Sequence, residues 1–139
     1  MSKLLVVNCA GLSPAVFKRL SEKSSALKKM PSESSMRPMQ PVFPAVTMPM
    51  QATMLTGVLP TEHGCISNSR LDRRTLKYDS WEQSALLLDK QPFWKQKEYA
   101  KKKVATVCWQ FSYFSDANYV VSPAPIHDRS GALVSAIYS

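Results

Sequence analysis

Apolar residues occur along the chain in short runs of strand length, separated by polar segments. Residues 3–7 read Lys-Leu-Leu-Val-Val, a continuous apolar run that is typical of a parallel strand covered on both faces. Ser13 and Pro14 then supply an N-cap and a first helical residue. Three apolar residues at helical spacing follow them: Val16, Phe17 and Leu20. The pattern predicts a first strand and a crossover helix.

The next part of the chain changes character twice. Residues 21–40 are polar, rich in Ser and Lys, and show no sustained period, so they predict a flexible loop. Residues 42–46 are apolar, with Pro44 among them, and predict a short strand. Residues 51–55 run into Gly57 and have the pattern of a helix that ends at a glycine.

The remaining elements follow a charged stretch at residues 70–79. Residues 81–88 and 92–102 predict two helices, of which the second is basic, while residues 103–111 and 119–121 predict strands. The expected order is therefore β, α, β, α, α, α, β, which is typical of an α/β fold. The length of 139 residues predicts one domain.

Composition narrows the class of protein. Hydrophobic residues make up 45% and charged residues 20%, which is typical of a globular domain and excludes a disordered chain. An odd set of three cysteines, Cys9, Cys65 and Cys108, fits neither a disulfide framework nor a metal knuckle, so we expect reduced thiols. No apolar stretch approaches the roughly 20 residues of a bilayer span. We therefore expect a cytoplasmic protein without a membrane partner.

The formal net charge of +8 favours anionic partners. Much of the excess lies in residues 18–29 and 90–103, where neither an aromatic ladder nor a nucleic-acid module accompanies it. A solvated basic face explains these charges better than a nucleic-acid site, so nucleic acid is not an expected partner.

Thr47 is the first candidate for chemistry. It precedes Pro49 at the predicted start of the helix that ends at Gly57, so its hydroxyl is expected beside unpaired backbone N–H groups and the positive end of the helix dipole. Such a position suits a phosphate group. By pattern alone, a plain helix cap is the favoured interpretation of Thr47.

The residues around Thr47 form an ordered set of motifs. The set comprises Pro44-Ala45-Val46-Thr47-Met48-Pro49, Gln51-Ala52-Thr53-Met54-Leu55-Thr56-Gly57, Pro60-Thr61-Glu62-His63-Gly64 and Asn68. It resembles the type I phosphodiesterase/nucleotide pyrophosphatase family of the alkaline phosphatase superfamily. The resemblance extends to about Gly131, and residues 44–68 carry its specificity. It implies that residues 1–139 are the N-terminal part of an alkaline-phosphatase-like, three-layer α/β/α domain with a mostly parallel sheet.

The resemblance also implies a chemistry. Thr47 occupies the position of the nucleophile, and Asn68 that of a donor to the phosphoryl oxygen. A threonine hydroxyl needs activation, which two zinc ions supply in this family, one of them on the nucleophile. The implied function is metal-dependent hydrolysis of phosphate esters or nucleotides. His63, in the turn, is expected to bond backbone groups rather than a metal.

Two departures from the family pattern bear on activity. Active members end the first strand in Asp-Gly, where the Asp binds a metal, whereas this chain has Ala10 and Gly11, with Asn8 and Cys9 as poor substitutes. The other family ligands lie beyond the present chain, whose remaining histidine, His127, precedes Asp128. We therefore expect the isolated chain to be inactive. We also expect it to be the N-terminal portion of a longer protein or a truncated product.

Three hypotheses remain open from the sequence. The chain is the nucleophile half of a phosphate-ester hydrolase, or a non-catalytic fragment that binds phosphate or a partner, or, on net charge alone, a nucleic-acid-binding module. The sequence determines neither the substrate nor the oligomeric state.

Overall fold

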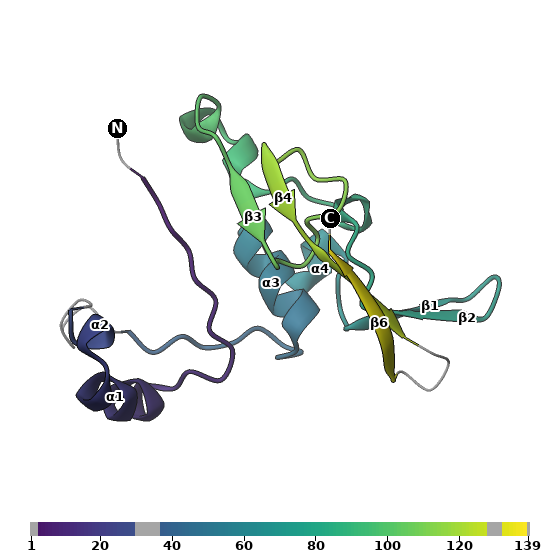
Figure 1. Ribbon diagram of the computed structural model, residues 1–139. Coiled ribbons are helices and arrows are strands. Elements are labelled where there is room, and N and C mark those ends of the chain that lie inside the picture. Colours follow the sequence, from purple (N-terminus) through teal and green to yellow (C-terminus); the bar gives the residue numbers. More distant parts are fainter. Residues whose placement is uncertain (1–2, 30–36, 128–131, 139) are drawn as a thin grey trace. The chain divides into compact units, whose positions relative to one another are not determined.

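The computed structural model describes residues 3–29, 37–127 and 132–138. Contacts divide the chain into two compact units, Met1–Gln40 and Pro41–Ser139, and each unit is described by itself. Figure 1 shows the elements of both along the sequence.

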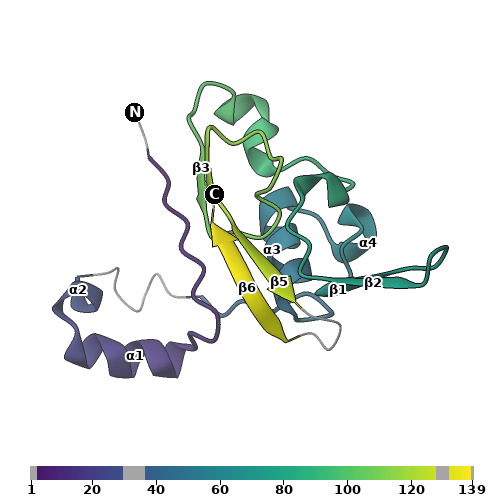
Figure 2. The ribbon, with the colours of Figure 1, turned by 45° about the vertical axis from the view of Figure 1, so that its right-hand side comes forward.

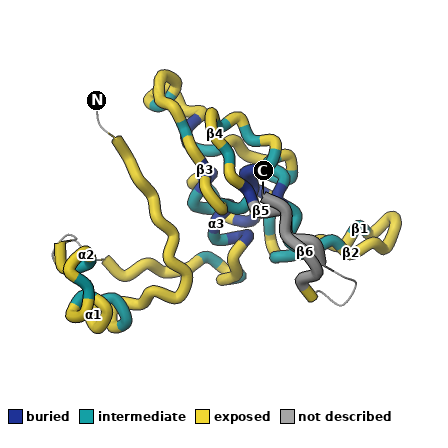
Figure 3. Tube along the Cα trace, viewed as in Figure 1, coloured by how far each residue is buried: buried dark blue, intermediate teal, exposed yellow. Residues whose placement is uncertain are grey.

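The described part of the first unit contains the helices α1 (Pro14–Lys23) and α2 (Ser25–Lys28). The predicted start of the first helix is confirmed, because the Ser13 hydroxyl accepts a hydrogen bond from the Val16 N–H at 3.3 Å and Pro14 begins the helix. No described residue of this unit is buried (Figure 3). The apolar stripe of α1 therefore has no core to pack into.

The predicted strand at residues 3–7 is wrong for this structure. The segment belongs to no strand of the described chain, and its apolar side chains are exposed, with exposed fractions of 55% to 85% from Leu4 to Val7. A parallel strand of this composition requires neighbouring strands and cover on both faces. The first unit supplies neither.

The segment 21–40 begins with more helix than the sequence pattern predicts. The end of α1 and all of α2 lie within it, and Ser24 caps α2 by accepting a bond from the Leu27 N–H. Residues 30–36 lie outside the described residues. The flexibility of the segment stays a prediction.

The second unit holds the core of the described chain. Helix α3 (Thr47–Thr56) is followed by the short helix α4 (Pro60–His63). In Figure 3 the buried segments gather on α3 and the loops against it. The buried apolar residues are Met48, Ala52, Leu55, Trp94 and Phe111.

Among the described residues, three two-stranded sheets accompany these helices. The antiparallel pair β1 (Ser69–Asp72) and β2 (Lys77–Ser80) projects as a hairpin in Figures 1 and 2. Strands β3 (Ala105–Val107) and β4 (Tyr119–Val121) are parallel, and β5 (Pro123–His127) and β6 (Leu133–Tyr138) are antiparallel. The predicted strand at 119–121 is confirmed, whereas that at 103–111 is reduced to three residues because Cys108 has a φ of 51°.

Two predicted helices are wrong. Residues 81–88 contain only a 3₁₀ turn at Ala85–Leu87, because the segment pairs with Tyr113 through its backbone: the Ala85 N–H donates to the Tyr113 carbonyl at 2.7 Å. Residues 92–102 form two 3₁₀ turns, Phe93–Lys95 and Lys97–Tyr99, separated by extended backbone at Gln96.

The predicted strand at residues 42–46 is also absent, since the segment forms bends. Pro41 and Pro44 have no N–H to donate to a strand ladder. The fold is nevertheless a mixture of helices and short sheets with one parallel pair, so the α/β class is confirmed at that level. Within the described ranges, none of the helices has the length and apolarity needed to traverse a bilayer.

Candidate functional site

The start of α3 is capped from a distance. Its N-cap residue is Val46, which has no side-chain acceptor, and Thr47 is the first residue inside the helix, next to the cap. The missing acceptor comes from Asn68, whose Oδ1 receives the Met48 N–H at 2.9 Å. This bond brings Asn68 to the first turn of the helix, next to Thr47.

The backbone around Asn68 fixes this arrangement. Its carbonyl accepts the Trp81 N–H at 2.9 Å, which ties the residue to the end of the β1–β2 hairpin. Because a backbone N–H must meet the oxygen of the carboxamide, Oδ1 faces Met48 and the NH₂ group is the other arm of the same planar group. Asn68 is half-buried, and among the hydrogen bonds of the described residues none uses this NH₂ group.

Most backbone N–H groups at the start of α3 already have an acceptor, so few remain as donors to a ligand. The Val46 N–H donates to the Pro44 carbonyl at 2.9 Å, the Met48 N–H to Asn68, and Pro49 has none. Among the hydrogen bonds of the described residues, none uses the Thr47 N–H. That N–H lies at the positive end of a helix of ten residues and beside an exposed hydroxyl.

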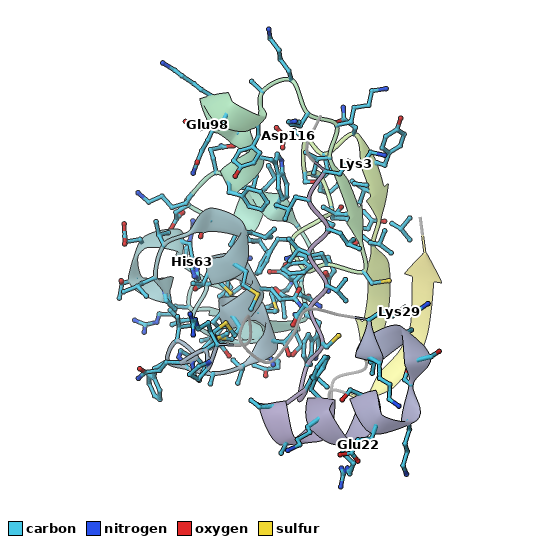
Figure 4. The ribbon with its side chains drawn as sticks, turned by 90° about the vertical axis from the view of Figure 1, so that its left-hand side faces the viewer. Lys3, Glu22, Lys29, His63, Glu98 and Asp116 are labelled. Atoms are coloured by element: carbon cyan, nitrogen blue, oxygen red, sulfur yellow. The ribbon has the colours of Figure 1, made fainter. Side chains whose placement is uncertain are left out.

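His63 closes the turn that leads to Asn68. It is fully buried, with an exposed fraction of 0%, and Figure 4 labels it among the helices of this unit. Its Nε2 lies 3.0 Å from the Thr53 hydroxyl, and its Nδ1 accepts the Cys65 N–H at 3.2 Å. Burial lowers the pKa of His63 below its ordinary value of 6.5 and so favours the neutral ring. These bonds agree with the structural role that the sequence predicts.

Candidate metal ligands do not gather around Thr47. Across residues 3–29, 37–127 and 132–138, no group of three His, Cys, Asp or Glu side chains could hold a metal ion. Both ring nitrogens of His63 are occupied, and burial raises the pKa of the Cys65 thiol, which disfavours the thiolate that a metal would need. Ala10 has no ligand atom, and Asp128 lies outside the described residues, as does the side chain of His127.

Three glutamines form a series of hydrogen bonds that links α3 to two later segments of the chain, and the sequence analysis did not predict it. Gln51 accepts the Gln110 N–H at 2.8 Å, and the Gln110 carboxamide oxygen accepts from Gln83 Nε2 at 2.6 Å. Gln51 and Gln83 are both buried. Gln51 could have indicated this series, because it lies on the buried face of a helix and a buried carboxamide needs hydrogen-bond partners.

A cavity of about 190 Å³ opens elsewhere in the second unit, with Trp94, Phe111 and Asp116 among its lining residues. Asp116 accepts the Trp94 Nε1–H at 3.1 Å and pairs with Lys95. Neither Thr47 nor Asn68 lines this cavity. The start of α3 is therefore the place where the predicted site residues meet.

Comparison with known proteins gives one match. The family model described as type I phosphodiesterase / nucleotide pyrophosphatase matches residues 4–135 of the 139. No curated protein and no solved structure matches the chain.

Proposed function

Because the chain belongs to the type I phosphodiesterase/nucleotide pyrophosphatase family, we propose that it recognises phosphate esters at the start of α3, where Thr47 is the nucleophile. The family is one of phosphodiesterase- and pyrophosphatase-type hydrolases, is generally metal-dependent, and implies phosphate-ester or nucleotide substrates. The observation that carries the proposal is the bond between Asn68 Oδ1 and the Met48 N–H, which brings two residues 20 positions apart in sequence to one helix end.

Charge and hydrogen bonding support an anion at this helix end. The Thr47 N–H and the Asn68 NH₂ group are both uncharged donors, and the helix dipole adds partial positive charge there. Two donors and a dipole suit phosphoryl oxygens, on which negative charge develops during attack. Asn68 is the proposed donor to a phosphoryl oxygen.

The Thr47 hydroxyl is suited to attack by its exposure at the first helical residue. A threonine hydroxyl is a weak nucleophile at its ordinary pKa and requires a base or a metal ion. No carboxylate or imidazole of the described chain is hydrogen-bonded to it. Attack therefore needs an activating group from elsewhere.

Zinc is the activating metal that the resemblance implies, in two ions, and the described residues do not fit such a site. They contain no group of three ligand side chains, and the histidine nearest in sequence, His63, spends both nitrogens on other bonds. We therefore propose that this chain by itself binds phosphate esters without turnover. Hydrolysis at Thr47 then requires ligands that the described residues do not supply.

The wider fold predictions belong to the same proposal. The parallel pairing of β3 with β4 and the helix α3 support an alkaline-phosphatase-like, three-layer α/β/α domain, of which residues 1–139 form the N-terminal part. A flexible loop at residues 21–40 and a cytoplasmic location stay predictions.

The test separates phosphate binding from the capping of α3. Asn68→Asp keeps an oxygen for the Met48 N–H, and Asp is as good a cap as Asn, but it replaces the donating NH₂ group with an anionic oxygen. Asn68→Ala removes both functions. We expect Asn68→Asp to weaken binding of an aryl phosphodiester about tenfold or more in isothermal titration, at unchanged melting temperature.

Thr47 has its own control pair. Thr47→Ser keeps the hydroxyl and Thr47→Ala removes it, while both keep the backbone N–H. On the isolated chain we expect no release of nitrophenol from the diester with or without added zinc. Release that depends on zinc and disappears in Thr47→Ala would support the nucleophile and overturn the lack of turnover. Equal binding by the wild-type chain and Asn68→Asp would overturn the proposed site.

A further inference from the structure

The Thr53 hydroxyl and the His63 ring form a contact that the function proposed above does not use. Thr53 lies on α3, about two turns after Thr47, and His63 is the last residue of α4. Thr53 Oγ1 and His63 Nε2 are 3.0 Å apart. His63 is fully buried, and Thr53 is half-buried.

The partners of the ring determine the direction of this bond. Nδ1 accepts the Cys65 N–H, so Nδ1 carries no proton. The proton of the neutral ring is then on Nε2, and Nε2–H donates to Thr53 Oγ1. In this state His63 cannot take a proton from the Thr53 hydroxyl, which excludes a second nucleophile–base pair at Thr53.

The contacts continue from His63 to Asn68. The Cys65 N–H is held by the ring, and the Cys65 thiol donates to the Ser67 carbonyl at 3.6 Å. The next residue is Asn68, which caps the Met48 N–H. The turn at residues 63–68 is thus fastened to α3 at two points, through Thr53 at its beginning and through Met48 at its end.

The turn at residues 63–68 is also confined by Asp89, which contacts it away from α3. Gly64 has a φ of +81°, and a Cβ added there would lie 2.5 Å from Asp89 Oδ2. The Asp89 N–H also donates to the His63 carbonyl at 3.2 Å. A turn confined in this way transmits a displacement of His63 to the residues that follow it.

We propose that the Thr53–His63 hydrogen bond is a positioning contact that holds the Asn68 carboxamide over the start of α3. The inference rests on the proposed phosphate site, and it names two residues that act on that site through Asn68 without touching the ligand. Loss of the bond leaves the ring free to shift, so the Met48 N–H loses its acceptor for part of the time and the donating NH₂ group is no longer fixed.

The matched pair Thr53→Val and Thr53→Ser tests the contact, because valine has the shape of threonine without the hydroxyl and serine keeps the hydroxyl. We expect Thr53→Val to raise the dissociation constant for the aryl phosphodiester about fivefold to tenfold, and Thr53→Ser to change it less than about twofold. Thr53→Ala, which favours the helix, serves as a second variant if the valine variant does not fold.

A second measurement needs no ligand. Amide hydrogen exchange at Met48, followed by NMR, should be faster in Thr53→Val and unchanged in Thr53→Ser, because the cap of Met48 depends on the contact. A lower melting temperature with unchanged Met48 exchange and unchanged binding would overturn the positioning role. If the wild-type chain binds no diester, the proposed function fails, and the Met48 exchange still decides whether Thr53 positions Asn68.

Discussion

The two units of the chain use similar apolar sequence with different results. Residues 3–7 form an apolar run and α1 carries an apolar stripe, yet no described residue among 3–29 and 37–40 is buried. The second unit buries Met48, Ala52 and Phe111 around α3. An apolar pattern therefore predicts a potential for burial, and burial follows only where other elements supply the facing surface.

The largest effect is expected when one aromatic ring is removed from each unit in turn. Phe111 has an exposed fraction of 2%, so Phe111→Ala should lower the free energy of unfolding by about 3–5 kcal/mol. Phe17 in α1 is only half-buried, and Phe17→Ala should change the free energy of unfolding of the second unit by about 0.5 kcal/mol or less. Urea titration followed by tryptophan fluorescence reports on the second unit alone, since Trp81, Trp94 and Trp109 all lie there. Equal losses would mean that both units unfold as one cooperative body.

A smaller effect is expected from a matched pair of glycines. Gly57, at the end of α3, and Gly11 have φ values of +74° and +75°, and a Cβ at either position would meet no atom within 4 Å. Gly57→Ala should therefore cost about 1 kcal/mol from backbone strain alone. Gly11→Ala should leave the fluorescence-detected midpoint unchanged, because the first unit has no core to lose. A shift of that midpoint in Gly11→Ala would contradict the comparison.

The smallest effect is a dependence on pH that belongs to the second unit, which contains both histidines. Burial lowers the folded pKa of His63, so below its ordinary value of 6.5 the unfolded chain takes up a proton that the folded chain does not. Stability is then fully present above pH 6.5 and falls as the pH decreases toward the folded pKa. Melting curves between about pH 7.5 and 5.5 should show this decline. His63→Gln should lower the melting temperature but remove its slope in this window, and an identical slope in the variant would assign the decline to other groups.

The sequence analysis predicted correctly those elements whose ends are determined by residues within the element or next to it. Ser13 and Pro14 start α1, Gly57 ends α3, and residues 119–121 form β4 as predicted. The β1–β2 hairpin was missed although its signal was present: Arg70 faces Asp79, and Asp72 faces Lys77, so opposite charges pair across the strands. The helix predicted at residues 81–88 failed because its backbone bonds to Tyr113, a partner that no local pattern contains.

The candidate site likewise has features that the sequence predicted and features that depend on contacts between distant residues. Family resemblance identified Thr47 and Asn68, and helix pattern placed Thr47 within one residue of its observed position. The capping of Met48 by Asn68 was not predicted, yet Val46 contained a hint, since valine is a poor N-cap and leaves a donor to be satisfied from elsewhere. The Thr53–His63 bond could not be read from spacing, because it depends on how α4 packs against α3.

The two ends of the Asn68 carboxamide have one further consequence, for the shelf life of a preparation. Its oxygen caps α3, and its nitrogen is the donor that we propose for a phosphoryl oxygen. Deamidation, the familiar ageing reaction of asparagine, replaces that nitrogen with an anionic oxygen: the aspartate product keeps an acceptor for the Met48 N–H, whereas the isoaspartate product of the same succinimide lengthens the main chain by one methylene. The aspartate fraction of an aged sample would keep the cap of α3 while its capacity for phosphate esters declines, so mass spectrometry of this residue, rather than a folding assay alone, is the appropriate measure of its condition.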